Sequence, residues 1–261
     1  MNPIMRVRGL GKSFGGIQAV KDVSFDLAAG STLGFIGPNG AGKTTVFNLI
    51  SGVTLPDRGE VLLDGQRVTR WPAHIRARHG IARTFQTMHL YRDLTARENV
   101  LMALHLHARY SMLAAILATP GVRRAEAALR TRAAQLLRRV GLEARADVKA
   151  GALSYGDQRR LDLCKALALE PRVLMLDEPA AGMNEEESRD LTALIAQLKA
   201  EHGLTVLIVE HHMDVVMSLS DEVVAMDFGE VIAHGPPDMV RRDARVLEAY
   251  LGQPAAEGEK A

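Results

Sequence analysis

The sequence contains a single cysteine, Cys164, among its 261 residues. One cysteine excludes a disulfide within the chain and is typical of a protein from a reducing compartment such as the cytosol. Long apolar runs are missing too, because the most apolar stretch, Ser111 to Ala118, is far shorter than the roughly 20 residues that cross a bilayer. Met1 to Leu10 lacks the pattern of a secretory signal. We therefore expect neither export nor a membrane channel.

Excess charge of one sign is also scarce, since 32 Lys and Arg are balanced by 31 Asp and Glu, for a formal net charge of +1. This balance provides no general attraction to nucleic acid, and no nucleic-acid partner is expected. A local group of arginines is present at Arg123, Arg124, Arg130, Arg132, Arg138 and Arg139. A nucleic-acid patch is one interpretation of this group, but we favour the solvated face of a helix.

Short β-branched runs alternate with helical patterns, which is typical of an α/β fold with a mainly parallel sheet wrapped by helices. Continuous apolar runs predict buried strands at Thr32 to Ile36, Val173 to Leu176, Thr205 to Val209 and Glu222 to Met226. Antiparallel strands are expected at Met5 to Leu10, Val23 to Leu27 and Val61 to Leu63.

Strand signals vanish between about Thr95 and Ala168, where an inserted, mostly helical subdomain is predicted. Thr95 and Glu98 have the spacing of a capping box at its start. We expect one domain over residues 4–252, with a sheet core at 4–94 and 169–252 and the helical subdomain at about 95–168. Residues 253–261 are small and polar and are expected to be disordered.

The strongest chemical signal is GPNGAGKT, between a predicted strand and a predicted helix, which is the context of a phosphate-binding P-loop. Its glycines let backbone N–H groups turn toward phosphate oxygens, and the helix N-terminus adds positive potential. Lys43 is expected to contact the β and γ phosphates, and Thr44 to ligate Mg²⁺. The predicted phosphate-binding segment consists of Gly37, Pro38, Asn39, Gly40, Ala41, Gly42, Lys43, Thr44 and Thr45.

Two carboxylates, Asp177 and Glu178, directly follow the predicted buried strand VLML. Ligands of α/β sheets bind at the carboxyl ends of such strands. We interpret the pair as a Walker B element, in which Asp177 holds magnesium through its water shell. Glu178 would orient or deprotonate the attacking water.

The segment LSYGDQRR at Leu153 to Arg160 resembles the signature motif of ABC ATPases. The resemblance implies that Ser154 caps a helix whose N-terminus, together with Gly156, faces a γ-phosphate bound by the opposite subunit of a head-to-tail dimer. It extends over nearly the whole chain, to the closing segment GEVIAHGPPDMV. The fold it implies is the P-loop NTPase core with an antiparallel β subdomain and an inserted helical subdomain.

Other motifs occur in the order of the same family. Gln86, in ARTFQ, resembles the Q-loop glutamine that reaches the magnesium and the attacking water. His211, after VLIVE, resembles the switch histidine at the γ-phosphate. Phe14, in GKSFGG, lies where the family places an aromatic side chain against adenine, although a core position would suit it equally.

Within the family, the segments GIARTFQ, ENVLMA, LSYG, DEPAAGMN and VLEAYLG look most like the ATP-binding subunits of branched-chain or hydrophobic amino-acid importers. This resemblance implies ATP and Mg²⁺ as cofactors and a second ATPase subunit, identical or different. It also implies transmembrane permeases and, indirectly, a periplasmic or extracellular substrate-binding protein. A peripheral place on the cytoplasmic face of the inner (plasma) membrane is expected. The segment Met88 to Tyr91 and the helical subdomain would receive a short permease helix.

The sequence departs from the common family pattern in two places. Tyr155 replaces the first glycine of LSGGQ, and the D-loop, Ala180 to Asn184, lacks the terminal aspartate of the SALD form. The partner contact through Asn184 is therefore open, and Asn184 and Glu187 also fit a helix capping box.

The motifs also bear on four other classes of protein. A GTPase would need an NKxD segment, and a protein kinase would need HRD, so DFG at Asp227 to Gly229 is interpreted as a turn. A non-transport ABC protein normally has two ATPase halves or a long coiled-coil insertion. An ATPase of the lipopolysaccharide-export type remains an alternative.

Overall fold

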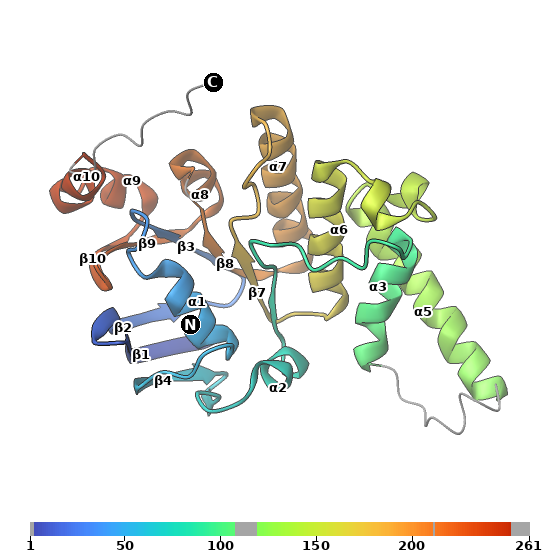
Figure 1. Ribbon diagram of the computed structural model, residues 1–261, viewed down its shortest axis with the longest axis horizontal. Helices are drawn as coiled ribbons and strands as arrows, with labels where there is room; N and C mark the ends of the chain where they lie inside the picture. Colours follow the sequence, from blue (N-terminus) through green and yellow to red (C-terminus); the bar gives the residue numbers. More distant parts are fainter. Residues whose placement is uncertain (1–2, 108–118, 211, 252–261) are drawn as a thin grey trace. The chain divides into compact units, whose positions relative to one another are not determined.

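The computed structural model describes residues 3–107, 119–210 and 212–251 of the chain (Figure 1). The apolar stretch Ser111 to Ala118, His211 and the predicted tail 253–261 therefore lie outside the described residues. Two compact units are present, one of residues 1–71 and 207–261 and the other of residues 72–206. Strand β8 (Thr205–Val209) spans the boundary between these units along the chain. Among the described residues, no helix combines the length and the apolar character that a membrane crossing requires.

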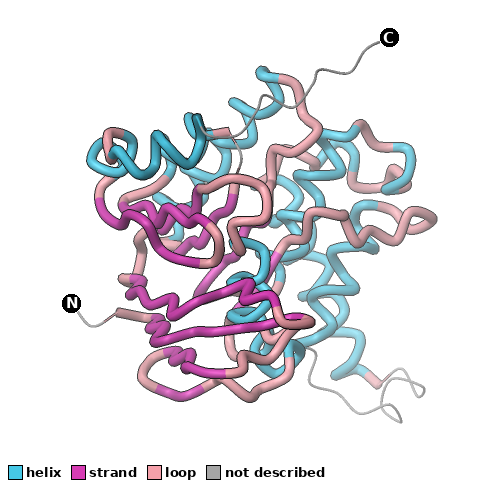
Figure 2. Tube along the Cα trace, turned by 60° about the vertical axis from the view of Figure 1, so that its left-hand side comes forward, coloured by secondary structure: helices cyan, strands magenta, loops and turns pink. Residues whose placement is uncertain are grey.

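The first unit contains most of the strand residues (Figure 2). An antiparallel sheet has the order β2-β1-β4-β5, and its strands are β1 (Met5–Phe14), β2 (Ile17–Leu27), β4 (Arg58–Leu63) and β5 (Gln66–Arg67). A parallel pair joins β3 to β9, and β10 is antiparallel to β9; their bounds are Thr32–Ile36, Glu222–Asp227 and Glu230–Gly235. The helices of this unit are α1 (Lys43–Ser51), α8 (Met213–Leu219), α9 (Pro237–Arg241) and α10 (Ala244–Leu251).

Three phenylalanines fix α1 against the strands of the first unit. Phe35 on β3 contacts Phe25 on β2 and Phe47 on α1, with ring centroids 5.3 Å and 5.8 Å apart and nearly perpendicular rings. Edge-to-face pairs of this kind add to the free energy gained from burying the rings. All five residues of β3 are buried, so the loop that leaves its carboxyl end starts from a rigid point.

The second unit is mainly helical, with strands β6 (Ile81–Arg83) and β7 (Val173–Asp177) paired in parallel. Its helices are α2 (Ala73–Arg78), α3 (Ala96–Leu104), α5 (Pro120–Arg139), α6 (Tyr155–Ala168) and α7 (Glu185–His202). Short 3-10 turns lie at His105–His107, Glu143–Arg145 and Ala150–Ala152. Helices α3, α5 and α6 pack against one another (Figure 1). The predicted subdomain limits of about 95 and 168 stay a prediction, because the compact units divide the chain at other positions.

The predicted α/β class is confirmed, with parallel strands, an antiparallel sheet and a group of helices. Strand β1 continues to Phe14 and β2 begins at Ile17, beyond the expected Leu10 and Val23. Apart from Gly11 and Val20, the residues of both extensions are half-buried or exposed, so no continuous apolar run predicts them. The hairpin register that pairs Phe14 with Ile17 joins the two extensions. Asp227 ends β9 and Glu230 begins β10, so DFG is a turn, as predicted.

The arginine-rich helix α5 has the arrangement of a solvated amphipathic helix. Its buried residues are apolar, namely Val122, Ala133, Leu136 and Leu137. Two of its arginines contact carboxylates, because Arg132 lies 3.3 Å from Glu170 and Arg138 lies 2.8 Å from Glu143. These neighbours agree with the interpretation of the group as a solvated face.

Candidate active site

The predicted phosphate-binding segment forms the turn between β3 and α1. Helix α1 begins at Lys43, and the residue before it, Gly42, has φ of 98°. A Cβ at Gly42 would lie 2.4 Å from the backbone oxygen of Ala19 on β2, so only glycine fits here. The close approach of β2 therefore fixes the loop at the point where the helix starts.

Lys43 lies inside this loop with a side chain that is only 5% exposed. Its ammonium donates hydrogen bonds to the carbonyl oxygens of Gly37, at 2.5 Å, and Pro38, at 2.9 Å. Asn39, Gly40 and Thr44 are exposed on the same segment. The first turn of α1 contains no acidic residue, so nothing on it opposes the positive potential of its N-terminus. The loop thus combines a buried cation with a helix N-terminus, which is how proteins bind phosphate.

Phe14 lies at the tip of the β1–β2 hairpin, where Gly15 and Gly16 form the two-residue turn with φ of 52° and 87°. Its ring is 50% exposed and lies 5.5 Å from the ammonium of Lys12. The alternative of a core position for Phe14 is therefore wrong. Phe14 ends β1, and the paired strand β2 leads from the same hairpin to Ala19, which lies beside Gly42 of the loop.

In the second unit, Asp177 ends β7 and Glu178 follows it, with 2% and 7% of their surfaces exposed. Arg83, at the end of β6, forms an ion pair with Asp177 at 2.5 Å, and both side chains are nearly buried. The parallel pairing of β6 with β7 brings these residues together across 94 positions of sequence. The sequence does not identify Arg83 as a site residue. It lies in the segment ARTFQ, in which only Gln86 resembles a residue of a family motif.

Gln86 and Glu178 are joined directly. The Nε2 of Gln86 donates a hydrogen bond of 2.8 Å to Oε2 of Glu178. Glu178 also has φ of 50°, a left-handed conformation that is uncommon outside glycine and is found at functional sites. The structure thus brings together three of the predicted residues, Gln86, Asp177 and Glu178, in the second unit.

Ser154 caps α6, as the sequence predicts, since its Oγ accepts a hydrogen bond from the backbone N–H of Asp157. Gly156 lies in the first turn of the same helix and is buried. A Cβ there would come within 3.2 Å of Oε1 of Glu187, so this glycine packs closely on α7. Asn184 caps α7 in a complete capping box with Glu187, which confirms the structural role considered for it.

Tyr155, the departure from the signature pattern, contacts the D-loop. Its hydroxyl donates to the carbonyl oxygen of Ala181 at 2.8 Å and accepts from Nη2 of Arg159 at 2.7 Å. Arg159 also donates to Ala181 at 3.1 Å. A Cβ at Gly182 would lie 3.0 Å from the tyrosine hydroxyl, so the ring occupies the space beside that glycine.

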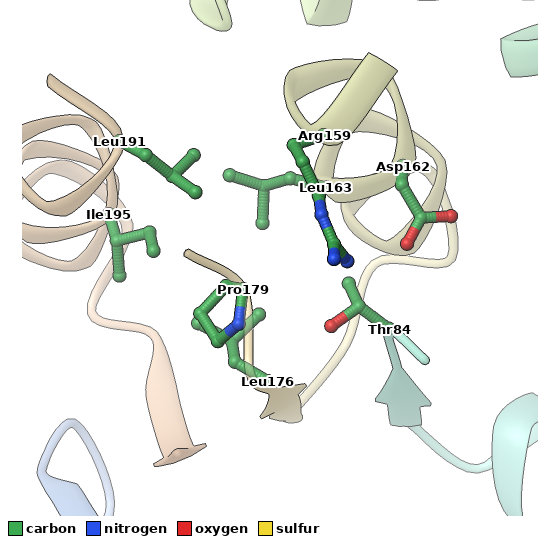
Figure 3. A pocket seen from close by; sticks show the side chains of 8 residues that line it. All are labelled: Thr84, Arg159, Asp162, Leu163, Leu176, Pro179, Leu191 and Ile195. Carbon is green, nitrogen blue, oxygen red and sulfur yellow. The ribbon is translucent and has the colours of Figure 1, made fainter. Parts of the chain in front are cut away.

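Beside Arg159 lies a cavity with room for one water molecule at most (Figure 3). Leu163, Leu176, Pro179, Leu191 and Ile195 line its apolar side, while Thr84, Arg159 and Asp162 lie together on the other side (Figure 3). Burial raises the pKa of Asp162, which the cations of Lys165 and Arg159 partly oppose. Such a cavity is too small for a nucleotide and belongs to the packing of α6 against α7.

A strand, a glycine-rich loop closed around a lysine and a helix that begins at that lysine define a P-loop nucleotide-binding protein. A family model described as "ABC transporter" matches residues 20–181, and one described as "Branched-chain amino acid ATP-binding cassette transporter" matches residues 230–256. The chain belongs to the ABC transporter family as an ATP-binding subunit, and it is an ATPase.

One curated relative is the high-affinity branched-chain amino acid transport ATP-binding protein BraF of Pseudomonas aeruginosa. The two are 45% identical over 251 residues, which is 96% of this chain and 98% of BraF. Among solved structures, the ADP conformation of MJ1267, an ATP-binding cassette of an ABC transporter, has a TM-score of 0.82 at 30% identity, covering 97% of this chain and 100% of that one. A dimeric post-hydrolysis state of the cassette MJ0796, bound to ADP and Pi, has a TM-score of 0.74 at 28% identity, covering 89% and 98%.

Proposed function

We propose that this ATPase hydrolyses Mg·ATP to power the uptake of branched-chain or other hydrophobic amino acids through separate permease subunits. The observation that carries the proposal is the match of residues 230–256 to a branched-chain amino-acid cassette family. Identity of 45% to BraF over nearly all of both chains supports it. The lipopolysaccharide export ATP-binding protein LptB of Acidithiobacillus ferridurans is less similar to this chain, with 34% identity over 252 residues.

In the proposed reaction, Lys43 turns its ammonium from the carbonyls of Gly37 and Pro38 to the β and γ phosphates of ATP. The backbone N–H groups of the loop and of Thr45 hold the remaining phosphate oxygens. Phe14 stacks on the adenine ring from the hairpin tip, where its face is accessible. His211 is proposed to contact the γ-phosphate, and it lies outside the described residues.

Magnesium is proposed to arrive with ATP and not to reside in the protein. Among residues 3–107, 119–210 and 212–251, no group of three or more His, Cys, Asp and Glu could hold a metal ion by itself. The Thr44 hydroxyl, the Asp177 carboxylate and the Gln86 amide are oxygen donors of the kind that Mg²⁺ prefers. Because Nε2 of Gln86 bonds to Glu178, its amide oxygen is the end available to the ion. Bound magnesium would neutralise charge on the β and γ phosphates.

Glu178 is proposed to accept the proton of the attacking water. The residue is 7% exposed, and Gln86 donates to one oxygen of its carboxylate. The hydrogen bond orients the carboxylate and connects it to the segment that follows Gln86. A water between Glu178 and the γ-phosphate would then be polarised and aligned for attack.

Two ATPase subunits, identical or different, are proposed to close over ATP. The exposed Ser154 at the N-terminus of α6 would face the γ-phosphate bound by the other subunit, with the backbone of Gly156 beside it. The dimeric state of the MJ0796 cassette supports this arrangement. Since Gly156 is packed against Glu187, the contact at this residue would come from its backbone N–H.

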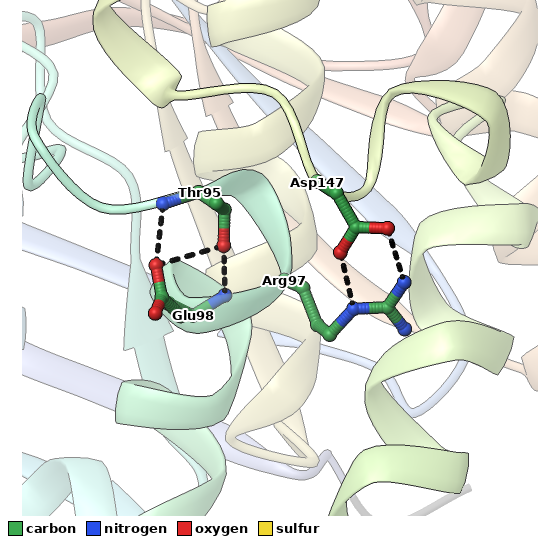
Figure 4. Close-up of polar contacts among 4 residues, drawn as sticks. All are labelled: Thr95, Arg97, Glu98 and Asp147. Atoms are coloured by element: carbon green, nitrogen blue, oxygen red, sulfur yellow. Dashed lines mark hydrogen bonds and ion pairs between the residues drawn. The ribbon is translucent and has the colours of Figure 1, made fainter.

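The permease contact is proposed at the segment Met88 to Tyr91. Tyr91 is 53% exposed, while its backbone N–H and carbonyl both bond to the side chain of Asn99, which is buried on α3. The start of α3 is itself held by the capping box of Thr95 and Glu98, and the two-pronged ion pair of Arg97 with Asp147 lies beside it (Figure 4). A rigid backbone that presents an exposed aromatic side chain suits the docking of a partner helix.

This contact would place the chain on the cytoplasmic face of the inner (plasma) membrane as a peripheral subunit, with the substrate-binding protein acting indirectly. The test is reconstitution of the chain with its permeases and binding protein, followed by uptake of radiolabelled leucine, isoleucine and valine. ATP-dependent uptake is expected. Failure to move any hydrophobic amino acid, with lipopolysaccharide extracted instead, would establish the export alternative.

A further inference from the structure

The C-terminal helix reaches the phosphate-binding loop through one tyrosine. Tyr250, on α10, accepts a hydrogen bond of 2.8 Å at its hydroxyl from the backbone N–H of Gly37. Gly37 is the first residue of the loop, and 213 positions of sequence separate it from Tyr250. Burial raises the pKa of this tyrosine, so the hydroxyl keeps its proton at neutral pH.

Gly37 is held tightly on its other sides. Its φ is 144°, and a Cβ at this position would lie 2.1 Å from the backbone oxygen of Met226 on β9. Its carbonyl oxygen accepts the ammonium of Lys43 at 2.5 Å. The two peptide units that meet at Gly37 therefore connect the Tyr250 hydroxyl, which bonds to the Gly37 N–H, with the Lys43 ammonium, which bonds to the Gly37 carbonyl.

Helix α10 is anchored well enough to act through this contact. Val246, 1% exposed, belongs to a buried cluster with Ile36, Val216 and Val240, and Tyr250 packs against the same cluster. Ile36 is the last residue of β3 and directly precedes Gly37. The helix thus packs on the end of the strand from which the loop departs.

We propose that Tyr250 is a positioning residue for ATP binding, which holds the Gly37 peptide in the phosphate-receiving conformation of the loop. When Lys43 turns to a phosphate, the Gly37 carbonyl loses that donor, while the Tyr250 hydroxyl still accepts from the Gly37 N–H on the preceding peptide unit. Without the hydroxyl, the loop spends less time in the receiving conformation, and the apparent affinity falls in proportion. The inference rests on the ATP-binding role of the loop.

The experiment compares the full chain with Tyr250→Phe, which removes only the hydroxyl, and with Val246→Ala, which weakens the packing of α10 but leaves Tyr250 in place. Titration calorimetry gives the Kd for Mg·ATP, thermal unfolding without nucleotide gives Tm, and steady-state hydrolysis gives kcat and KM. For Tyr250→Phe we expect a Kd and KM that are roughly threefold to tenfold higher, with kcat within about twofold of the parent.

Val246→Ala is expected to lower Tm while leaving Kd close to that of the parent. A Tyr250→Phe chain that binds Mg·ATP as tightly as the parent overturns the inference, whatever its Tm. So does a Kd for Val246→Ala that rises as much as that of Tyr250→Phe, because helix packing alone would then explain both. Failure of the parent itself to bind ATP would instead refute the role of the loop.

Discussion

The amide nitrogen of Gln86 and the carboxylate of Glu178 are 2.8 Å apart and share a hydrogen bond. Gln86 begins the segment that leads to the exposed Tyr91, and Glu178 follows the strand that ends at Asp177. A shift of the segment at Tyr91 would therefore be felt at the carboxylate that is proposed to activate water. The bond would thus connect the segment proposed for the permease contact with the rate of hydrolysis.

Replacing Lys43 with alanine should abolish ATP hydrolysis and weaken nucleotide binding. The ammonium is buried among loop carbonyls, and water cannot replace a fixed cation beside the β and γ phosphates. We expect a fall in turnover of at least ~100-fold, the usual effect of removing one preorganised charge from a transition state. Steady-state phosphate release measures it, and undiminished turnover would contradict the assignment of the loop.

Replacing Glu178 with glutamine should yield a protein that binds Mg·ATP, hydrolyses it at least ~100-fold more slowly and accumulates as an ATP-bound dimer. The amide keeps the size of the carboxylate but cannot accept a proton, and it removes a negative charge near the γ-phosphate. Light scattering after size-exclusion chromatography, with and without Mg·ATP, detects the dimer.

The matched control adds Ser154→Arg to Glu178→Gln. Ser154 is exposed at the N-terminus of α6, so an arginine can be accommodated in the monomer but would obstruct a phosphate at that end. The double variant is expected to bind ATP and remain monomeric. A dimer that ignores both ATP and the arginine would show association through a different surface.

Replacing Tyr155 with phenylalanine should slow hydrolysis by the dimer without changing ATP affinity. The hydroxyl bonds to Ala181 of the D-loop and to Arg159, so its loss leaves the D-loop held by fewer bonds. Loss of one such bond predicts a roughly threefold to tenfold slower rate. Tyr91→Phe removes a hydroxyl from an exposed tyrosine and serves as the control. Equal rates for Tyr155→Phe and the parent would rule out a role for this contact.

Charged residues at Leu90 and Tyr91 should uncouple transport while sparing nucleotide binding. Glutamate at both positions would place charge on the surface proposed to meet an apolar permease helix. Uptake in proteoliposomes should be lost while the Kd for Mg·ATP is unchanged. Leu55→Glu is the control, since Leu55 is 50% exposed and Tyr91 is 53% exposed. Intact assembly and uptake in the Leu90 and Tyr91 variant would place the permease contact elsewhere.

Cys164 should resist alkylation in the native protein at pH 8. The residue is fully buried, and burial raises the pKa of its thiol from 9.0 to about 12, so the reactive thiolate is scarce. Because the folded pKa lies above the unfolded one, this thiol stabilises the fold below pH 9 and loses that contribution as the pH rises toward 12. Iodoacetamide labelling, with and without denaturant, measures the protection. Rapid labelling of the native chain would contradict it.

Much of the fold could be predicted because its central strands are buried on both faces. The runs at Thr32–Ile36 and Thr205–Val209 are entirely buried, and the predicted bounds agree with β3 and β8. The sequence does not predict strand β10, since its residues are mostly half-buried or exposed and the turn-forming residues GPP follow at its end. Pairing with β9, which no local pattern encodes, makes it a strand.

In the site too, contacts between residues close in the sequence could be predicted, and contacts between distant residues could not. Ser154, Thr95 and Asn184 were predicted as helix caps, because a cap and its partner lie three residues apart. The pairs of Arg83 with Asp177 and of Gly37 with Tyr250 join residues that are 94 and 213 positions apart. Only the packing of strands and helices brings such residues together, so no spacing rule could have predicted them.

The ring of Tyr155 fills the space beside Gly182, where a Cβ would lie only 3.0 Å from its hydroxyl. The signature motif and the D-loop of this chain therefore form a matched set. A hybrid protein that took one of them from a cassette with the LSGGQ motif would either leave a void beside Gly182 or force a new side chain into the tyrosine. We expect exchange between the two kinds of cassette to succeed only when both loops are transplanted together.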